Sequence, residues 1–404
     1  MLGLAAMLPG LARAAEIDTS DLHDMTGDVP DITAAERGQR LERAQRLMRE
    51  HNIDAILVEP GSSMIYFTGI QWWRSERLTA AILPAQGEAI VVTPFFEEPS
   101  IRETLSIPAD VRVWQEDEDP LARVAQGLRD RGLAGGTVGI EETVRYFASD
   151  GLAARVPGLK LVSANPVVRG CRLHKSPAEI ALLQKASDVT IAAYRWTHAR
   201  VREGMDPGEV QALMVAAQNK LGGKADGGLV LIGESAAYPH GSHKPQRVRE
   251  GQVVLMDFGC TVHGYESDIS RTFVLGHAPD DVRRVWDTVA QGQQIAIRTA
   301  QIGTPAGHVD DAVRHFYESK GYGPGYKLPG TSHRTGHGIG LDGHEPVNLV
   351  HGEMTPLAAG MCFSDEPGIY LPGKFGVRLE DCFHLTEAGP RFFSEPPKSI
   401  DQPV

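Results

Sequence analysis

Short apolar runs and amphipathic helical segments alternate over residues 33–170. Thr33 and Glu36 have the spacing of a helix N-cap and its capping glutamate, and apolar residues then recur at helical spacing as far as Met48. Buried strands are predicted at the apolar runs 53–58, 79–83, 89–93, 137–140 and 159–162, and a further helix is predicted over 120–131. The second and third runs form a hairpin around Gly87. This alternation is typical of an α/β domain.

A second unit begins sharply at Ser176. The sequence Ser176-Pro177-Ala178-Glu179 places an N-cap, a proline at the first helical position and a capping glutamate in order. The predicted helix continues toward Tyr194. Further helices are predicted over 207–221, 281–299 and 307–320, with glycine-punctuated strands between and after them. We therefore expect one domain over 33–170 and a second over 173–404.

Composition supports this organisation and removes several classes of protein. A chain of 404 residues corresponds to two or three domains at about 150 residues each. The 40 basic and 52 acidic residues give a net charge of −12, which opposes binding to nucleic acid. No apolar run is long enough to predict a membrane-spanning helix. The four cysteines form no CxxC pair, so neither a disulfide scaffold nor a thiolate zinc site is expected.

The first 15 residues resemble an export signal. An apolar stretch over 2–12 is followed by Ala12-Arg13-Ala14, which has the small-residue pattern of a cleavage site, but no basic residue precedes the apolar stretch. The expectation is export to the periplasm, with a cytoplasmic location as the alternative. Residues 1–15 are left out of the fold prediction.

Two β-hairpins in the second half each bring a pair of carboxylates together. Asp257 and Asp268 flank a turn at 262–265, which makes them opposite or diagonal neighbours across the hairpin. Glu366 and Glu380 are symmetric about Gly373. Carboxylates on one sheet face repel each other, and a cation between them removes that repulsion. Either hairpin alone is also compatible with a solvated surface cluster, but the occurrence of two favours a metal site.

Histidines cluster in two nearby segments. His333, His337 and His344 lie among five glycines between Gly330 and Val347, and His240 and His243 precede the first hairpin. Four carboxylates and one histidine would balance the charge of two divalent cations. Oxygen-rich ligation favours Mn²⁺, and histidine also admits Co²⁺, Fe²⁺ or Zn²⁺. Two metals about 3.5–4 Å apart generate a bridging hydroxide and polarise a carbonyl, which is the chemistry of amide hydrolysis.

The motifs around these residues form a recognisable set. They are MDFG at Asp257, SDISRTF at Asp268, HGIGLDGHE at His337 and His344, DEPGIY at Glu366 and GVRLED at Glu380. In order and spacing they resemble the metallopeptidases of the creatinase, prolidase and aminopeptidase P group. The stretches at 172–186 and 65–77 extend the resemblance toward the N-terminus. It implies an α/β (α+β) fold, in which an N-terminal creatinase-like domain precedes a C-terminal pita-bread catalytic domain.

The resemblance also implies a role for each candidate residue. The five metal ligands that it implies are Asp257, Asp268, His337, Glu366 and Glu380. Asp268 and Glu380 would bridge both ions, and Glu366 would take the proton from the metal-bound water. His240 and His344 would act on the substrate, and Arg378 and His333 would belong to the substrate pocket. His243 is a weaker candidate. Asp365 has no assigned role, and strand alternation turns it to the other face.

The activity implied by the resemblance is hydrolysis of Xaa-Pro bonds in dipeptides or short peptides. We expect an Xaa-Pro dipeptidase (prolidase), with an Xaa-Pro aminopeptidase as the alternative, because the ligand motifs of the two are shared. A dipeptidase must close its pocket around a free carboxylate, and the stretch from Trp72 to Arg77, which includes Trp73 and Arg74, is a candidate wall. The same apolar and basic stretch, together with the resemblance, predicts a homodimer or a higher homo-oligomer.

Three further alternatives are weaker. A metal-free relative of the creatinase type, or a non-catalytic binding protein on the same fold, would have lost metal ligands, and all five are present. Methionine aminopeptidase shares the metal core, but the long region before Arg172 favours the two-domain branch of the group.

Overall fold

The first half of the chain is built on a mixed six-stranded sheet. Its strands are β1 (Ala55–Val58), β2 (Ala80–Pro84), β3 (Ala89–Pro94), β4 (Ala109–Trp114), β5 (Thr137–Ile140) and β6 (Lys160–Ser163), in the order β4-β3-β2-β1-β5-β6. β2 runs antiparallel to β1 and β3, and the remaining pairs are parallel. The structure is a computed structural model that describes residues 17–404, so the signal-like segment at 1–15 lies outside the described residues.

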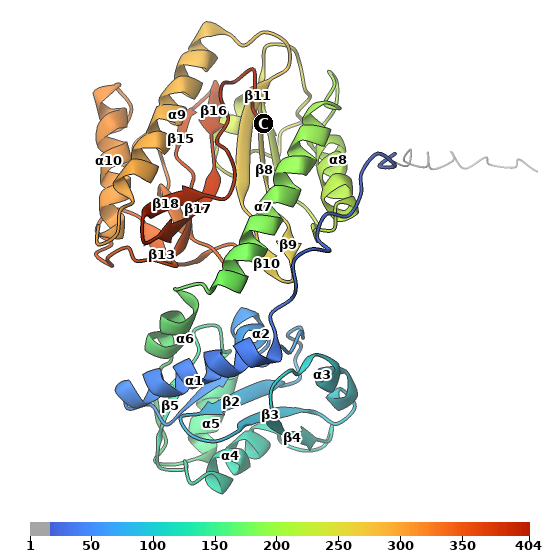
Figure 1. Ribbon diagram of the computed structural model, residues 1–404, viewed down its shortest axis with the longest axis vertical. Helices are drawn as coiled ribbons and strands as arrows, with labels where there is room; N and C mark the ends of the chain where they lie inside the picture. The colour runs from blue at the N-terminus through green and yellow to red at the C-terminus, as the bar shows by residue number, and fades with distance from the viewer. Residues whose placement is uncertain (1–16) are drawn as a thin grey trace, which may run out of the picture.

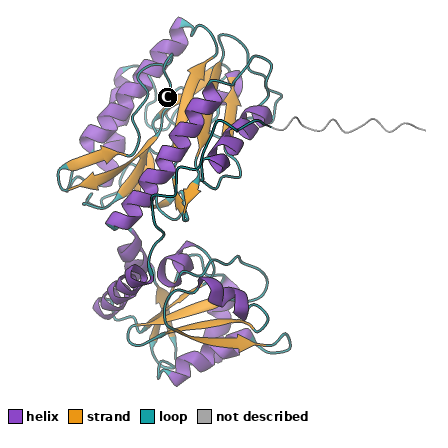
Figure 2. Cartoon of the chain, turned by 45° about the vertical axis from the view of Figure 1, so that its right-hand side comes forward, coloured by secondary structure: helices purple, strands orange, loops and turns teal. Residues whose placement is uncertain are grey.

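Helices cover both faces of this sheet (Figure 2). They are α1 (Ala34–Glu50), α2 (Ser62–Thr68), α3 (Glu98–Thr104), α4 (Pro120–Asp130), α5 (Tyr146–Arg155) and α6 (Asn165–Arg172). Ile56 and Val58 pack with α1, α2 and α6, whereas Ala55 and Leu57 pack with α4 and α5. Because successive side chains of a strand point to opposite faces, β1 is buried on both sides and its sequence is continuously apolar.

The second half encloses antiparallel sheets between two pairs of helices. Figure 1 shows α7 (Pro177–His198) and α8 (Pro207–Lys220) on one side and α9 (Asp280–Thr299) and α10 (Ala306–Ser319) on the other. Between them, β11 (Ile269–Val274), β8 (Val253–Phe258) and β7 (Leu229–Ile232) form a three-stranded sheet in that order. Val254 and Met256 of β8 share a core with α7 and α8, and Val253 and Leu255 share one with α9 and α10.

Further strands continue this layer toward the C-terminus. One sheet has the order β13-β12-β14-β17-β18, with β12 (Gly336–Gly338), β13 (Glu345–Leu349), β14 (Cys362–Asp365), β17 (Asp381–Thr386) and β18 (Gly389–Phe392). Two short hairpins join β9 (Thr261–Val262) to β10 (Tyr265–Glu266), and β15 (Gly368–Leu371) to β16 (Phe375–Arg378). A 3₁₀ helix, η1 (Gly233–Ala237), follows β7. The expected succession of an α/β domain and a mixed α and β domain is confirmed.

The two predicted helix starts differ in how completely they form. At Ser176 the capping box is closed, because its hydroxyl accepts from the amide of Glu179 (3.3 Å) and the Glu179 carboxylate accepts from the amide of Ser176 (2.8 Å). At Thr33 only half of the box forms. The Glu36 carboxylate instead accepts from the hydroxyl of Ser176 at 2.6 Å, a contact between the two domains. The hydroxyl of Ser176, which is distant in sequence, thus takes the place of the amide of Thr33 as the partner of the Glu36 carboxylate.

The lead-in to α1 lies along the second domain before the chain enters the first (Figure 1). Asp21 accepts from the indole of Trp196 at 3.0 Å, and Asp28 pairs with Lys185 at 2.8 Å. Buried Arg40 of α1 then donates to the hydroxyl of Tyr265 at 2.9 Å. These contacts fix the first domain against α7 and β10. None of the helices within residues 17–404 combines the length and hydrophobicity that a bilayer crossing requires.

Candidate active site

A pocket of about 460 Å³ collects the chemistry-bearing residues of the second domain. Its lining residues are Pro239, His240, Asp257, Asp268, Ser332, His333, Arg334, His337, His344, Glu366, Arg378 and Glu380. They come from β8, β12, β16 and the segments beside these strands. The fold therefore brings the implied ligands and most of the implied substrate residues into one cavity.

The first hairpin presents its carboxylates as diagonal neighbours. In the pairing of β8 with β11, Asp257 lies opposite Ser270, and Asp268 lies two residues before Ser270. The connection turns at His263 and Gly264, which both have positive φ angles of 48° and 85°. Two consecutive residues of this kind make the tight turn that matches strand twist, and the turn fixes the register.

The second hairpin places its carboxylates directly across from each other. Asp365 pairs with Asp381 and Gly368 pairs with Arg378, so Glu366 and Glu380, which lie between these pairs, are in matching positions. Gly373 at the turn has a φ of 76°, a conformation that favours glycine. The amide of Glu380 also donates to the carbonyl of Ser270 at 3.1 Å, which joins this hairpin to β11.

These side chains form groups that fit divalent metal ions. Asp257, Asp268 and Glu380 have oxygen atoms within 4.8 Å of one another, and ligand atoms of His337, Glu366 and Glu380 form a second such group. The two groups share Glu380. A ligand set of carboxylates and imidazole suits Mn²⁺ and several other divalent metals. The donor set of the described residues therefore fits a pair of adjacent cations.

The charges in the pocket show why a cation is favourable. Burial raises the pKa values of Asp268 and Glu380 well above their ordinary range, and the nearby carboxylates raise both pKa values further. Burial acts in the same direction on Glu366, but the hydrogen bond and charge of His337 outweigh it and lower the pKa of Glu366 to about 2. The site thus contains more negative charge than its own cationic groups neutralise.

His337 is oriented to offer Nε2 to the pocket. Its Nδ1 lies 3.0 Å from the carbonyl of Gly338, and because a carbonyl only accepts, Nδ1 carries the proton of that bond. Nε2 lies 3.2 Å from Glu366 and 3.7 Å from Asp268. A backbone carbonyl that fixes the far nitrogen is the usual support of a metal-binding histidine. The strand can sit this close because Gly336 has no Cβ, which would lie 2.0 Å from the carbonyl oxygen of Ser364.

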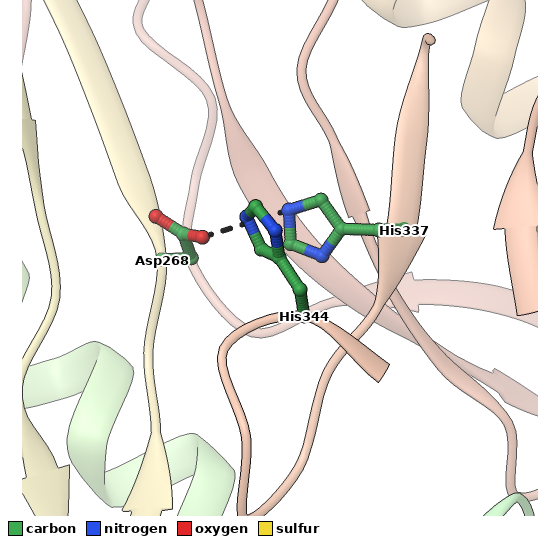
Figure 3. Close-up of side chains that lie close together, drawn as sticks. All are labelled: Asp268, His337 and His344. Carbon is green, nitrogen blue, oxygen red and sulfur yellow. Dashed lines mark ion pairs between the residues drawn. The ribbon is translucent and has the colours of Figure 1, made fainter. Parts of the chain in front are cut away.

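His344 lies close to His337 but is held differently. The ring centroids are 3.9 Å apart, and Figure 3 shows both rings directed toward Asp268. His344 Nδ1 lies 3.2 Å from Nη2 of Arg334. A guanidinium only donates, so Nδ1 accepts and the proton of the neutral ring resides on Nε2. Burial, and then the charges of His337 and Arg334, lower the pKa of His344 and favour this neutral form.

Arg378 is enclosed by partners on every side. Its Nη2 donates to Asp257 at 2.6 Å, and its Nε donates to the hydroxyl of Ser270 at 3.0 Å. Nη1 donates to the carbonyl of Pro239 and to the hydroxyl of Tyr370. Tyr370 in turn lies 2.8 Å from Nε2 of His333, whose Nδ1 bonds the carbonyl of Arg334. Arg378 and His333 line the pocket as expected, but their polar atoms are engaged with protein groups.

Asp365 faces away from the pocket, as strand alternation predicts. It is fully buried, it is absent from the pocket lining, and neither carboxylate oxygen has a hydrogen-bond partner among the described residues. Burial, and next the charge of Asp381, raise its pKa well above the ordinary value. This environment favours the neutral form of the carboxyl group.

Several residues singled out from the sequence do not line this pocket. His243 is exposed outside it. Trp72 donates its indole N–H to Glu97 and Arg77 pairs with Glu116, both within the first domain, and Arg74 contacts Thr143 there. This stretch therefore does not wall the pocket of its own chain, because its polar groups are satisfied within its own domain, and its place beside the pocket of a neighbouring chain stays a prediction.

Sequence reasoning overlooked three polar residues of the site. They are Arg334, Ser270 and Tyr370. Ser270 donates to Glu380 at 2.7 Å and is recognisable afterwards as the residue opposite Asp257. Arg334 gave a weaker signal, a single charge between His333 and His337.

Two family patterns match the chain over nearly all of its described length. The pattern of metallopeptidase family M24 matches residues 181–387, and that of the creatinase/prolidase N-terminal domain matches residues 40–174. The chain belongs to metallopeptidase family M24. The creatinase-like N-terminal domain and the pita-bread catalytic domain are thereby confirmed, whereas the expected bounds 33–170 and 173–404 stay predictions.

Named relatives in this family are peptidases. The probable dipeptidase PepE of Mycobacterium tuberculosis is 33% identical over 360 residues, which cover 87% of this chain and 92% of the relative. The crystal structure of dipeptidase PepE from Mycobacterium ulcerans superposes with a TM-score of 0.83 at 31% identity, over 92% of this chain and 98% of that one. The prolidase structure from Thermococcus sibiricus has a TM-score of 0.81 at 28% identity, with coverages of 89% and 97%.

The carboxylate groups predict how this M24 protein responds to loss of a ligand. Asp268→Ala removes a carboxylate of one ligand group and Glu380→Ala removes the carboxylate that both groups share, so we expect loss of bound metal and no measurable turnover. Metal analysis after chelation and reloading checks the first expectation, and an assay of peptide hydrolysis checks the second.

Asp365→Asn is the matched control, because it alters a buried carboxyl that faces away from the pocket. It should keep the metal content of the unaltered protein. Normal metal content and activity in either alanine variant would overturn the ligand assignment.

Proposed function

We propose that this M24 metallo-exopeptidase is an Xaa-Pro dipeptidase. The observation that carries the catalytic part is the pair of three-residue groups sharing Glu380 inside one pocket. The names of the relatives support the dipeptide substrate, and prolidase structures of similar fold support the preference for proline. The remaining residues of the pocket can be assigned roles consistent with cleavage before proline.

Asp257, Asp268, His337, Glu366 and Glu380 would hold the two cations, with Mn²⁺ as the proposed metal. When bound, such ions supply a nucleophilic water at neutral pH and polarise the scissile carbonyl. Glu366 lines the pocket 3.2 Å from His337 and would accept the proton of the attacking water. Ser364 donates to its Oε1 at 3.3 Å and so orients the carboxylate.

His344 and His240 are assigned to the substrate. With Nδ1 accepting from Arg334, His344 presents Nε2–H as a donor. A donor at this place can stabilise the oxygen that becomes negatively charged during attack on the carbonyl. His240 lines the pocket and is exposed, so its ring is accessible to a peptide.

Cleavage before proline requires a site that recognises groups other than the scissile N–H. The scissile nitrogen of an Xaa-Pro bond carries no hydrogen, so a peptidase cannot bind the bond through its N–H. Recognition must use the carbonyl, the chain ends and the ring. The pocket offers donors from histidine and arginine side chains for the carbonyl and for the carboxylate end of the substrate.

The substrate proposal predicts a clear preference between two peptides. Mn²⁺-loaded protein should hydrolyse Ala-Pro with a higher kcat/KM than Ala-Pro-Ala, by about tenfold or more, because a dipeptidase pocket is complementary to the free carboxylate. Steady-state kinetics on both peptides measures this. Faster cleavage of the tripeptide would identify an aminopeptidase instead.

The histidine assignment predicts a separation of metal binding from turnover. His344→Ala and His240→Ala should retain the full metal content, since neither residue is needed for the two ligand groups that share Glu380. The rate should fall on the order of 10²–10³ when a positioned donor is removed. Metal analysis beside kinetics decides this. Reduced metal content in His344→Ala would make His344 a ligand, because it also lies within 4.8 Å of Asp268 and His337 atoms.

We also propose that the chain forms a homodimer through its first domain. Trp72 and Trp73 stack with ring centroids 4.2 Å apart, and Trp73 is 65% exposed. Phe95 and Phe96 are exposed large hydrophobic residues of the same domain. Exposed apolar surface of this kind is typical of interfaces. Light scattering should give twice the chain mass, and a monomer with full activity would contradict the proposal.

A further inference from the structure

Helix α10 carries a buried ion pair that lies outside the pocket. Asp310 and Arg314, four residues apart on the helix, are 0% and 7% exposed, and Nε of Arg314 donates to the carboxylate of Asp310 at 2.7 Å. Neither residue lines the pocket. Because two buried charges are costly unless further hydrogen bonds satisfy them, the other partners of this pair indicate what it holds in place.

The guanidinium of Arg314 uses its remaining donors on three backbone carbonyls. Nη1 donates to the carbonyls of Gly325 at 2.9 Å and Thr331 at 3.1 Å, and Nη2 donates to the carbonyl of His333. These bonds tie the segment after α10 to the helix. They also fix the guanidinium, and through it the carboxylate of Asp310.

The carboxylate of Asp310 is directed at the backbone just before His337. Its Oδ1 accepts from the hydroxyl of Thr335 at 2.7 Å and from the amide of Thr335 at 3.1 Å. Its Oδ2 accepts from the amide of His351 at 3.0 Å. Thr335 is fully buried. Hydrogen bonds to an ionised acceptor are about twice as strong as neutral ones, so Thr335 is held firmly by the helix.

Thr335 connects two members of one candidate ligand group. It precedes His337 by two residues, and its carbonyl accepts from the amide of Glu366 at 2.9 Å. His337 and Glu366 form one group with Glu380, and Glu380 also belongs to the other group, whose remaining carboxylates come from the first hairpin. Within residues 17–404 the hydrogen bonds of Thr335 do not reach that hairpin. The support from α10 therefore acts on one group and not on the other.

We propose that Thr335, held by the Asp310–Arg314 pair, is a positioning residue that sets the affinity of the cation position formed with His337 and Glu366, and not that of the other position. Groups that orient metal ligands from outside typically change metal affinity by about 10–100-fold when they are lost. This inference rests on the ligand assignment of the proposed function, and it adds a determinant of metal affinity that lies outside the pocket.

Calorimetric titration of the metal-free full chain with Mn²⁺ measures both positions without any peptide. Thr335→Val keeps the shape of the side chain and removes the hydroxyl, so it should weaken one of the two binding steps by about tenfold and change the other by less than about twofold. His337→Ala identifies the step that belongs to this group. Thr335→Ser, which keeps the hydroxyl, should leave both steps within about twofold of those of the unaltered protein.

Thr68→Val is the matched control. Thr68 is also fully buried, and its hydroxyl donates to the carbonyl of Met64 at 2.7 Å in the first domain. The control loses a buried hydrogen bond in the same way but should leave both binding steps unchanged. Equal weakening of both steps in Thr335→Val, or no change in either, would overturn the inference.

Asp310→Asn tests the ion pair itself. Its amide group presents a donor where Thr335 or Arg314 already donates, so the same binding step should weaken. A normal isotherm for this variant would overturn the role of the pair. The inference and the ligand assignment are tested separately. If His337→Ala leaves both steps unchanged, the ligand assignment is wrong and the inference falls with it. If His337→Ala weakens one step and Thr335→Val does not, the assignment stands and only the inference is wrong.

Discussion

Four carboxylates brought into one pocket are the constraint on which the rest of the second domain depends. Asp257, Asp268, Glu366 and Glu380 would drive the two hairpins apart if they were ionised together without a counter-charge. Protein groups compensate part of this repulsion. Asp257 accepts from Arg378 and Glu380 accepts from Ser270. Asp268 has the weakest support, His337 at 3.7 Å, and burial, followed by the charge of Asp257, raises its pKa well above the ordinary value. A pair of bound cations would supply the remaining charge, so the fold and the proposed chemistry would follow from the same arrangement.

Behind the pocket, a buried ion pair holds the two ligand-bearing hairpins together. Arg271 of β11 is fully buried and donates to Asp381 of β17 at 2.7 Å, and its Nη1 donates to the carbonyl of Glu380 at 2.8 Å. Breaking such a pair typically costs about 3–5 kcal/mol, whereas a surface pair such as Arg283 with Asp401 contributes about 0–1 kcal/mol. The buried pair therefore stabilises the packing of β11 beside β17 more than a surface ion pair would. Asp268 and Glu380 sit on the pocket side of these strands, so their proximity depends on contacts made on the opposite side.

The parts of the site that the sequence predicts are those governed by strand register. A tight turn fixes which residues face each other, so the pairing of Glu366 with Glu380 could be deduced from numbering about Gly373. The same kind of pattern exists in β4, where Val111 and Val113 alternate with charged residues, although that strand was not predicted. Arg334 lies in a segment with no regular period, and its contact with His344 depends on how two loops fold together. Periodicity carries no information about such contacts, and resemblance had to supply the roles of the histidines.

The contact between the domains explains why the first domain matters to chemistry in the second. Glu345, the residue after His344, is buried, and although burial acts to raise its pKa, the charges of Lys175 and Arg172 lower the pKa to about 2. Lys175 donates to one carboxylate oxygen at 2.9 Å, and Arg172 donates to the other. Arg172 also bonds the hydroxyl of Ser63, which belongs to α2 of the first domain. The loop that presents His344 is thus anchored by an ionised carboxylate whose cationic partners are Arg172, at the end of α6, and Lys175, between α6 and α7. Because a buried charge that loses its partner is costly, the end of α6 and the first domain cannot shift without disturbing this loop. The contacts between the two domains therefore give rigid support to the exposed loop that carries His344.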